Sequence, residues 1–439
     1  MIVNKAACIF LTVVLLLFSP VGYATESDIA LTTAENLTKH KFSKVYKSFD
    51  KKVKKQISKP ALEKLWIDKE KGLGEYKSIG KITTTTVQGF RKSTIQIKYE
   101  NGQFELTLYL TKKNKIAGLS FSIPEYSPPP EAVNKVFGRE KIIVQTDTFK
   151  MKGELLLPED CNQCPVVIIL QGSGPSNMDG SNPTNPNRPY LDLAYGFALS
   201  GIASIRFDKR TYTYGKNAMP EGKVSLESEY IEDALSAIKL AKSYPFLDST
   251  KIAIVGHSLG AYSAPLIAAR DTSLSGIVVL SGPVRPVFEV IPDQYEFLLQ
   301  LDNKYTDDEK ALVDSMRQEV LLIQKKPSTV KELKHLGTNA MLPYYDYMIN
   351  YNPIDTIKKL DCKVLIAQGN RDYQVRYDQE YNRYFNSLNT YDHVSFKLFE
   401  GLNHLLMFGT KPSTPSEYYV PGNVDEQVTK YIAEWMLNK

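Results

Sequence analysis

Ser258 is the residue best placed in this sequence to act as a nucleophile. The residues around it read Gly256-His257-Ser258-Leu259-Gly260. A β-branched apolar run over 251–255 and an alanine-rich amphipathic run over 259–270 predict a strand, a tight turn and a helix. Such a turn exposes the serine hydroxyl, and glycines two residues before and after leave it room. The helix would also direct backbone N–H groups toward a developing oxyanion. The five-residue pattern alone also arises by chance.

The elements that must position this serine lie downstream of residue 138, where short apolar runs alternate with longer amphipathic ones. We expect strands at 141–147, 154–157, 166–170, 202–207, 251–255, 276–280, 363–367 and 394–399. We expect helices at 190–200, 227–244, 259–270, 375–388 and 424–437. This alternation predicts a mostly parallel sheet with helices on both faces. No helix separates the first two runs, so these strands should pair antiparallel at one edge.

The order of strands, with the glycine-flanked serine after the fifth, resembles the α/β-hydrolase fold over residues 138–439. The chain is similar in particular to exported bacterial serine esterases that follow a small N-terminal α+β module of unknown function (DUF3887-like). The resemblance implies an eight-stranded, mostly parallel sheet with a helical lid. It also implies an acid and a base that serve Ser258.

A serine nucleophile needs a base, and the base needs an acid to orient it. In this family the acid follows the seventh strand and the histidine follows the eighth. The matching positions are Asp372 and His404. The order Ser258, Asp372, His404 is the one that the family uses. Asp378 and Asp355 are nearby carboxylates, whose ordinary role would be surface charge.

Histidine is scarce, with five in 439 residues. Beyond Asp372 only His393 and His404 remain. His393 precedes its predicted strand, so it would lie at the opposite end of the sheet. His257 belongs to the turn that carries Ser258. We therefore expect His404 to be the general base.

Ester cleavage passes through a tetrahedral oxyanion, which calls for two N–H donors about 3 Å away. The amide of Leu259, directly after the nucleophile, should be one donor. The other should come from the loop after the third strand, which resembles the family's His-Gly-Ser-Gly-Pro loop. Here it reads Gln171-Gly172-Ser173-Gly174-Pro175. Gln171 replaces the family's histidine, but the donor is backbone. We expect it to be the amide of Ser173, with Gly172 as the alternative.

Two further stretches surround the expected site. Residues 283–361 hold no predicted strand and indicate a helical lid, with helices at 287–301, 307–324 and 329–336. Such a lid would exclude water and set the acyl-chain size. Tyrosines near its end would either line an entrance or simply pack: Tyr344, Tyr345, Tyr347 and Tyr351. The stretch 206–210, Arg-Phe-Asp-Lys-Arg, resembles a family motif whose charges brace neighbouring loops.

Residues 26–123 form a different unit. Helical spacing over 29–49 and 60–69 gives way to alternating strands at 94–99 and 104–109, joined by Asn101-Gly102, a strong hairpin signal. This predicts a small α+β domain, similar in outline to the NTF2-like cone. A proline-rich linker is expected over 124–137.

The small unit is rich in lysine. Between residues 39 and 81 there are 14 lysines against 5 acidic residues. One interpretation is weak contact with an anionic polymer of the cell envelope. The other is an ordinary solvated face, and the sequence leaves both open.

The first 24 residues have the pattern of a secretory signal peptide. Lys5 precedes an apolar run over 8–18, and Gly22-Tyr23-Ala24 provides a small-residue cleavage site. The run is too short to span a bilayer as a helix. We therefore expect a protein that is secreted or located in the periplasm or cell envelope.

Composition narrows the class of protein and the kinds of partner and cofactor that it could bind. The chain is 43% hydrophobic and 23% charged, as in globular proteins, and a formal net charge of +5 indicates no nucleic-acid partner. Cys161 and Cys164 should form a structural disulfide or stay as thiols, and Cys362 should lie in the core. No second ligand pair or dinucleotide glycine pattern is present, so neither a metal nor a cofactor is expected.

The sequence thus predicts a serine carboxylesterase that hydrolyses short- to medium-chain esters of small molecules through an acyl-enzyme. One alternative is a serine peptidase or amidase acting on envelope peptides. Another, of a different class, is a non-enzymatic envelope-binding protein. The substrate-binding residues and the oligomeric state stay open.

Overall fold

The computed structural model describes residues 26–70, 73–100, 102–122, 126–181, 187–218, 225–325, 327, 330–337 and 341–438. The chain forms two compact units, a small one that ends at Ser122 and a large one that continues to the C-terminus. The expected signal peptide at 1–24 lies outside the described residues. Within them, no helix has the length and apolar character needed to cross a membrane.

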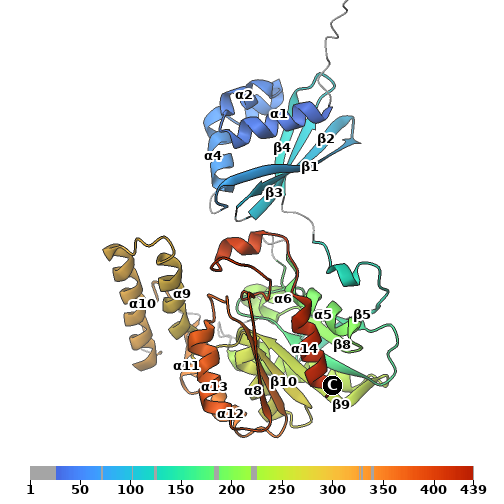
Figure 1. Cartoon of the computed structure of the whole chain (residues 1–439), viewed down its shortest axis with the longest axis vertical. Helices are drawn as coiled ribbons and strands as arrows, with labels where there is room; N and C mark the ends of the chain where they lie inside the picture. Colours follow the sequence, from blue (N-terminus) through green and yellow to red (C-terminus); the bar gives the residue numbers. More distant parts are fainter. Residues whose placement is uncertain are drawn as a thin grey trace, which may run out of the picture. The chain divides into compact units, whose positions relative to one another are not determined.

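The small unit packs four helices on a four-stranded sheet of order β1-β2-β3-β4 (Figure 1). The helices are α1 (Glu26–Thr38), α2 (Phe42–Ser48), α3 (Lys51–Gln56) and α4 (Lys59–Glu70). The strands are β1 (Tyr76–Val87), β2 (Phe90–Tyr99), β3 (Gly102–Leu110) and β4 (Ile116–Ser122). β2 and β3 are neighbours, as the hairpin signal predicted, although Asn101 itself is outside the described residues.

The single helix expected over 29–49 is wrong. α1 ends at Thr38, and His40 adopts the left-handed conformation with φ 53°, which no helix can continue through. The chain restarts as α2, and Asp50 then caps a third helix by accepting a hydrogen bond from the Val53 amide at 2.8 Å.

The large unit contains the predicted eight-stranded sheet, in the order β12-β11-β10-β9-β7-β8-β6-β5. Its strands are β5 (Gly138–Thr146), β6 (Phe149–Leu157), β7 (Cys164–Leu170), β8 (Ala203–Phe207), β9 (Leu247–His257), β10 (Gly276–Leu280), β11 (Lys363–Gly369) and β12 (Val394–Phe399). The six strands from β12 to β8 are parallel, whereas β6 pairs antiparallel with both β5 and β8. The predicted antiparallel edge is therefore confirmed.

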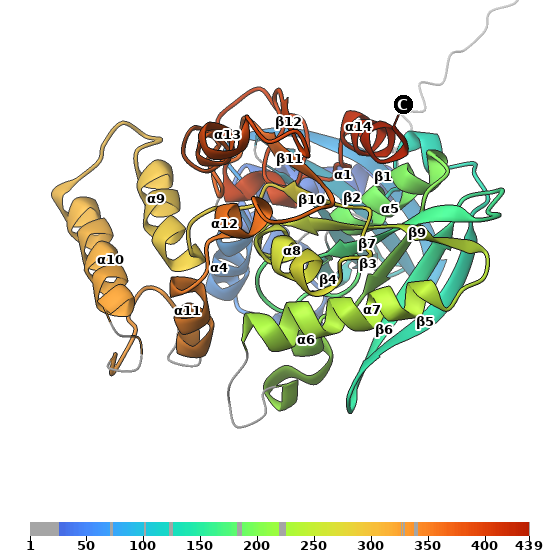
Figure 2. The same cartoon turned by 90° about the horizontal axis from the view of Figure 1, so that it is seen from below.

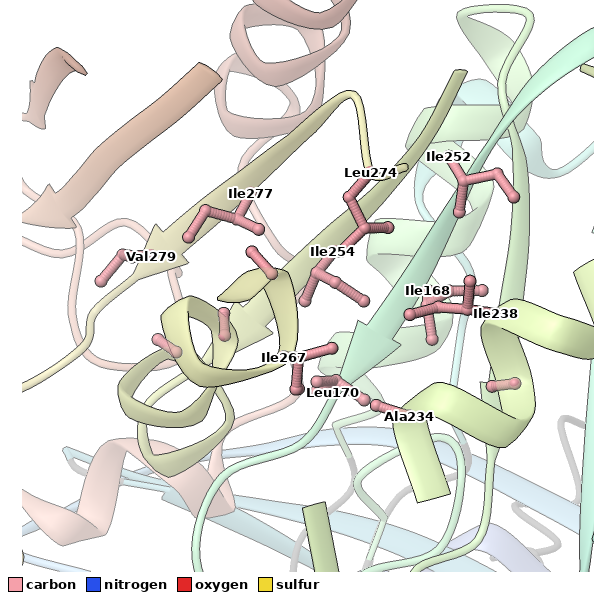
Figure 3. Packing of buried hydrophobic residues seen from close by; sticks show 14 of the residues in the cluster. Ile168, Leu170, Ala234, Ile238, Ile252, Ile254, Ile267, Leu274, Ile277 and Val279 are labelled. Atoms are coloured by element: carbon pink, nitrogen blue, oxygen red, sulfur yellow. The ribbon is translucent and has the colours of Figure 1, made fainter. Parts of the chain in front are cut away.

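Helices cover both faces of this sheet (Figure 2). One face packs against α7 (Glu232–Lys242), α8 (Leu259–Arg270), α12 (Pro353–Ile357) and α13 (Asn382–Leu388). The other packs against α5 (Pro189–Leu199) and α14 (Glu426–Leu437). Figure 3 shows Ile254 of β9 between Ile168 of β7 and Ile277 of β10, with Ile267 of α8 packed on the same side of the sheet. Because β9 is buried on both faces, Ser258, the residue that follows it, is held in a fixed position.

The lid region contains α9 (Val287–Leu299), α10 (Asp307–Lys325) and α11 (Leu342–Ile349). The helix expected at 329–336 is wrong, since the described part, 330–336, is irregular. Its amides bond to a side chain instead: the Glu319 carboxylate accepts from Lys334, His335 and Leu336 at 2.8, 3.2 and 3.1 Å. A side chain from the preceding helix α10 thus replaces the carbonyls that a local helix would have supplied.

Cys161 and Cys164 form a disulfide at the start of β7. Cys362 is a free thiol, half-buried beside the main core. The alternative of unpaired thiols at 161 and 164 is therefore not the one that the structure adopts.

Candidate active site

Ser258 forms the whole turn between β9 and α8. β9 ends at His257 and α8 begins at Leu259, so one residue reverses the chain, with φ 55° and ψ −118°. A non-glycine residue in this conformation is strained and is held by its surroundings. A Cβ on Gly256 would lie 2.4 Å from the Gly260 oxygen, and one on Gly260 would lie 2.6 Å from the Leu170 oxygen. Glycine is therefore required on both sides.

Asp372 and His404 form a buried pair at the same edge of the sheet. They follow the neighbouring parallel strands β11 and β12, and His404 Nδ1 lies 2.8 Å from Asp372 Oδ2. The amides of Gln374 and Val375 donate to Asp372 Oδ1 at 2.8 and 2.9 Å, which fixes the carboxylate. Because the carboxylate accepts the Nδ1 proton, neutral His404 keeps a lone pair on Nε2. This nitrogen can accept a proton from a hydroxyl.

His257 joins two loops of the site through a chain of hydrogen bonds. Its Nε2 lies 2.7 Å from the main-chain oxygen of His404, which can only accept, so Nε2 is protonated. Its Nδ1 then accepts from Tyr190 Oη at 3.1 Å, and Tyr190 Oη accepts from the Gly172 amide at 2.8 Å. Burial, with the nearby His404 as a second cause, lowers the pKa of His257 to about 3. His257 is therefore a neutral connector.

Ser258 lies against the glycine-rich loop that follows β7. A Cβ on Gly172 would be 3.1 Å from Ser258 Cβ and 3.5 Å from its Oγ. No hydrogen bond joins Ser258 Oγ to His404 Nε2 in the described structure. Such bonds often form only when substrate is bound.

The two expected amide donors of the glycine-rich loop differ in their partners. The Gly172 amide is already bonded to Tyr190, whereas Ser173 is exposed and its amide has no acceptor in the described part of the chain. Leu259 is the first residue of α8, so its amide has no acceptor within that helix. Ser173 and Leu259 thus leave two amides for a substrate oxygen.

The carbonyl of Gly172 was not expected to matter, yet two buried side chains bind it. Lys209 Nζ donates to it at 3.1 Å and Tyr230 Oη at 2.5 Å. The motif at 206–210 was the available signal, because its charges do contact neighbouring loops: Arg206 pairs with Glu154 and Asp179. Nothing in the sequence indicated Tyr230.

The alternative acid and base residues lie elsewhere in the fold. Asp378 pairs with Arg376 at 2.6 Å on the surface, and Asp355 lies in α12. His393 precedes β12, where its Nε2 lies 3.1 Å from the Ile357 oxygen. None of these residues joins the Asp372–His404 pair.

The lid contacts the loop that carries Asp372. Gln294 of α9 donates to the Gln374 oxygen at 2.8 Å, and the Phe297 ring stacks on Tyr373 with centroids 6.2 Å apart. Tyr344 and Tyr345 are buried in the cluster where the lid packs against Leu259 and Tyr262 of α8, so for these two tyrosines packing was the correct alternative. A cavity of about 970 Å³ lies between α8, α12 and the lid, but none of Ser258, Asp372 and His404 lines it. Among the described residues, no cluster of three or more His, Cys, Asp or Glu could hold a metal.

The family described as "Serine aminopeptidase, S33" (Hydrolase_4) matches residues 187–411, just over half of the chain. The chain belongs to this family. It is thus a hydrolase of the α/β-hydrolase superfamily, in agreement with its eight-stranded sheet. The S33 match contains Ser258, Asp372 and His404, whereas the loop with Gly172 and Ser173 precedes it. A second family, "Protein of unknown function (DUF3887)", matches residues 30–119.

The chain is also similar to individual proteins. "Esterase EstD" from Thermotoga maritima is 29% identical over 431 residues, which cover 97% of this chain and 99% of that protein. "Thiohydrolase apmlB" from Arthrinium phaeospermum is 29% identical over 110 residues, 25% of this chain and 35% of that protein. Among solved structures, Est1E from Butyrivibrio proteoclasticus has 17% identity and a TM-score of 0.42, covering 68% of this chain and 98% of that one.

Proposed function

We propose that this protein is a serine carboxylesterase with Ser258 as nucleophile, His404 as general base and Asp372 as the acid that orients it. The observation that carries the proposal is the 2.8 Å contact between His404 Nδ1 and Asp372 Oδ2, at the edge of the sheet where Ser258 occupies a strained turn. This arrangement leaves His404 Nε2 free to take the serine proton.

In this mechanism Ser258 attacks the acyl carbon while His404 accepts its proton. The amides of Leu259 and Ser173 stabilise the oxyanion, and Ser173 is favoured over Gly172 because Tyr190 already occupies the Gly172 amide. His404 protonates the leaving alcohol. Water, deprotonated by the same histidine, then hydrolyses the acyl-enzyme and restores Ser258.

The substrate class is short- to medium-chain esters of small molecules. Support comes from the relative named Esterase EstD, which aligns with nearly the whole chain. The lid helix α9 lies beside the Asp372 loop, where it would limit the length of the acyl chain.

Hydrolysis of p-nitrophenyl esters of graded chain length tests the proposal. The unaltered protein should turn them over, Ser258→Ala should lose turnover, and Ser273→Ala, which changes a serine in a surface turn, should keep it. Turnover that survives Ser258→Ala would refute the assignment of the nucleophile.

Amide hydrolysis is the second candidate, favoured by the description of the S33 family as serine aminopeptidases. Aminoacyl-p-nitroanilides, assayed beside the esters, separate the two activities. Cleavage of anilides alone would make the protein a peptidase or amidase. Cleavage of neither would favour the non-enzymatic binding protein.

For the small unit we propose weak contact with an anionic polymer of the envelope. A groove of about 610 Å³ is lined by Phe49, Asp50, Lys51, Lys54, Thr111, Lys112, Lys113 and Lys115. Its one carboxylate, Asp50, already caps α3. Binding of the protein to dextran sulfate should weaken as the salt concentration rises. The variant Lys112→Glu/Lys113→Glu should also bind dextran sulfate more weakly. The control variant Lys239→Glu/Lys358→Glu, which alters exposed lysines of the large unit, should bind it as the unaltered protein does.

Export is part of the same proposal and rests on the signal-peptide pattern of residues 1–24. Cleavage after Ala24 predicts a mature N-terminus at Thr25. Mass spectrometry of the protein recovered from the periplasm or medium of its host would measure this end. An unprocessed chain confined to the cytoplasm would contradict export.

A further inference from the structure

We propose that Lys209 and Tyr230 are positioning residues that direct the Ser173 amide toward the oxyanion. This inference rests on the proposed esterase function and identifies what holds its second oxyanion donor. Neither residue lies in the Ser258, Asp372 and His404 set, and both act through the carbonyl of Gly172.

The first step is the double contact on this carbonyl. Gly172 O accepts from Lys209 Nζ at 3.1 Å and from Tyr230 Oη at 2.5 Å, and both side chains are about 2% exposed. Lys209 Nζ also donates to Tyr230 Oη at 2.6 Å and lies 3.3 Å from Glu229 Oε2. The three donors of a lysine ammonium therefore have three acceptors.

The second step is the geometry of the peptide that follows. The carbonyl of Gly172 and the amide of Ser173 belong to one planar unit, and no described peptide bond is cis. In a trans peptide the C=O and N–H bonds point in opposite directions. Holding the Gly172 oxygen toward the buried Lys209 and Tyr230 therefore directs the Ser173 N–H away from them, out of the interior.

The amide of Gly172 is fixed as well. Tyr190 Oη accepts from it at 2.8 Å, and Tyr190 is in turn bonded to His257, next to Ser258. Buried side chains thus bind both backbone polar groups of Gly172. A residue restrained in this way can present the next amide with little reorganisation during the reaction, which is the condition for strong oxyanion stabilisation.

The charge of Lys209 adds an electrostatic effect. The Lys209 ammonium, bonded to the Gly172 oxygen, polarises the peptide and makes the Ser173 N–H a stronger hydrogen-bond donor. Because the site is buried, solvent screens this electrostatic interaction only weakly. Burial lowers the pKa of Lys209, and Glu229 opposes the shift by pairing with it. Glu229 is itself bonded to Thr211 and to Tyr344 of the lid helix α11. The Lys209–Glu229 ion pair thus contacts the lid through Glu229 and the glycine-rich loop through Lys209.

Two variants test the inference. Tyr230→Phe removes one donor to the Gly172 carbonyl, and Lys209→Met/Glu229→Gln removes the ion pair without leaving a lone buried charge. We expect kcat for p-nitrophenyl esters to fall about 10-fold and about 100-fold, respectively, with KM within about twofold, because an oxyanion donor acts mainly in the transition state. Affinity for a trifluoromethyl ketone, whose serine adduct carries an oxyanion, should fall in parallel.

The matched control is Arg210→Met/Asp233→Asn, which removes the adjacent buried ion pair that does not contact Gly172. It should lower thermal stability but leave kcat and ketone affinity unchanged. If kcat in both test variants stays within about threefold of the unaltered protein, or only KM rises, the inference is overturned. If the double variant fails to fold, Tyr230→Phe decides the question alone. Absence of ester turnover from the unaltered protein would overturn the esterase proposal itself.

Discussion

His257 Nε2 lies 2.7 Å from the main-chain oxygen of His404, so the residue before the candidate nucleophile is hydrogen-bonded to the candidate base. The same imidazole reaches the glycine-rich loop through Tyr190. One neutral, buried histidine therefore fixes the spacing of three loops that follow β7, β9 and β12.

On the acid side of its pH profile, kcat/KM should fall with the uptake of a single proton. Burial lowers the pKa of His257 to about 3, so this histidine stays neutral above about pH 4 and adds no proton to the acid side of the profile. We expect a limiting slope of one in a plot of log kcat/KM against pH. A slope of two would show that His257 also titrates.

Asp372→Asn should lower kcat about 10⁴-fold with little change in KM, because an amide no longer enforces the Nδ1–H tautomer of His404. Asp378→Asn is the matched control, since its surface pair with Arg376 lies outside the site. Steady-state kinetics on the same ester measure both. Equal losses in the two variants would contradict the assignment of the acid.

Tyr190→Phe should destabilise the fold and slow the reaction together. The change leaves the Gly172 amide and His257 Nδ1 without their partner, at a cost of about 1–3 kcal/mol in the free energy of unfolding. Burial raises the pKa of Tyr190 to about 12, so its hydroxyl is protonated under assay conditions. Urea denaturation and kcat measured on one preparation check both effects.

Asp192 should make stability fall as pH rises. Burial raises the pKa of Asp192 from its ordinary value of 3.8 to about 7, although hydrogen bonds from Tyr126, Val424 and Asn423 oppose the shift. The folded state therefore binds the proton more tightly, so this contribution is complete below about pH 4 and is lost as pH approaches 7, by at most about 4 kcal/mol.

The measurement for Asp192 is urea denaturation of the unaltered protein and of Asp192→Asn from pH 4 to pH 8. Asparagine cannot titrate, so the free energy of unfolding of the unaltered protein should fall relative to that of Asp192→Asn as pH rises. A difference that is constant over this range would show that Asp192 keeps its charge in the folded state.

The sequence by itself determined the α/β-hydrolase sheet and the position of Ser258 within it. Period-two and continuous apolar runs are local signals, and the glycines at 256 and 260 mark a turn that no larger residue could form. The same local signals failed at 29–49 and 330–336. There, a left-handed His40 and the carboxylate of Glu319 in the preceding helix α10 override helical spacing.

Only the tertiary structure decided which groups meet around Gly172. Lys209, Tyr230 and Tyr190 come from three different segments, and no spacing along the chain relates them to one another. Tyr190 lies in the connection after β7, and Lys209 and Tyr230 lie in the connection after β8. They converge because the neighbouring parallel strands β7 and β8 end at one edge of the sheet. Local sequence therefore specified the nucleophile, whereas the arrangement of its donors followed from burial and hydrogen bonding between loops.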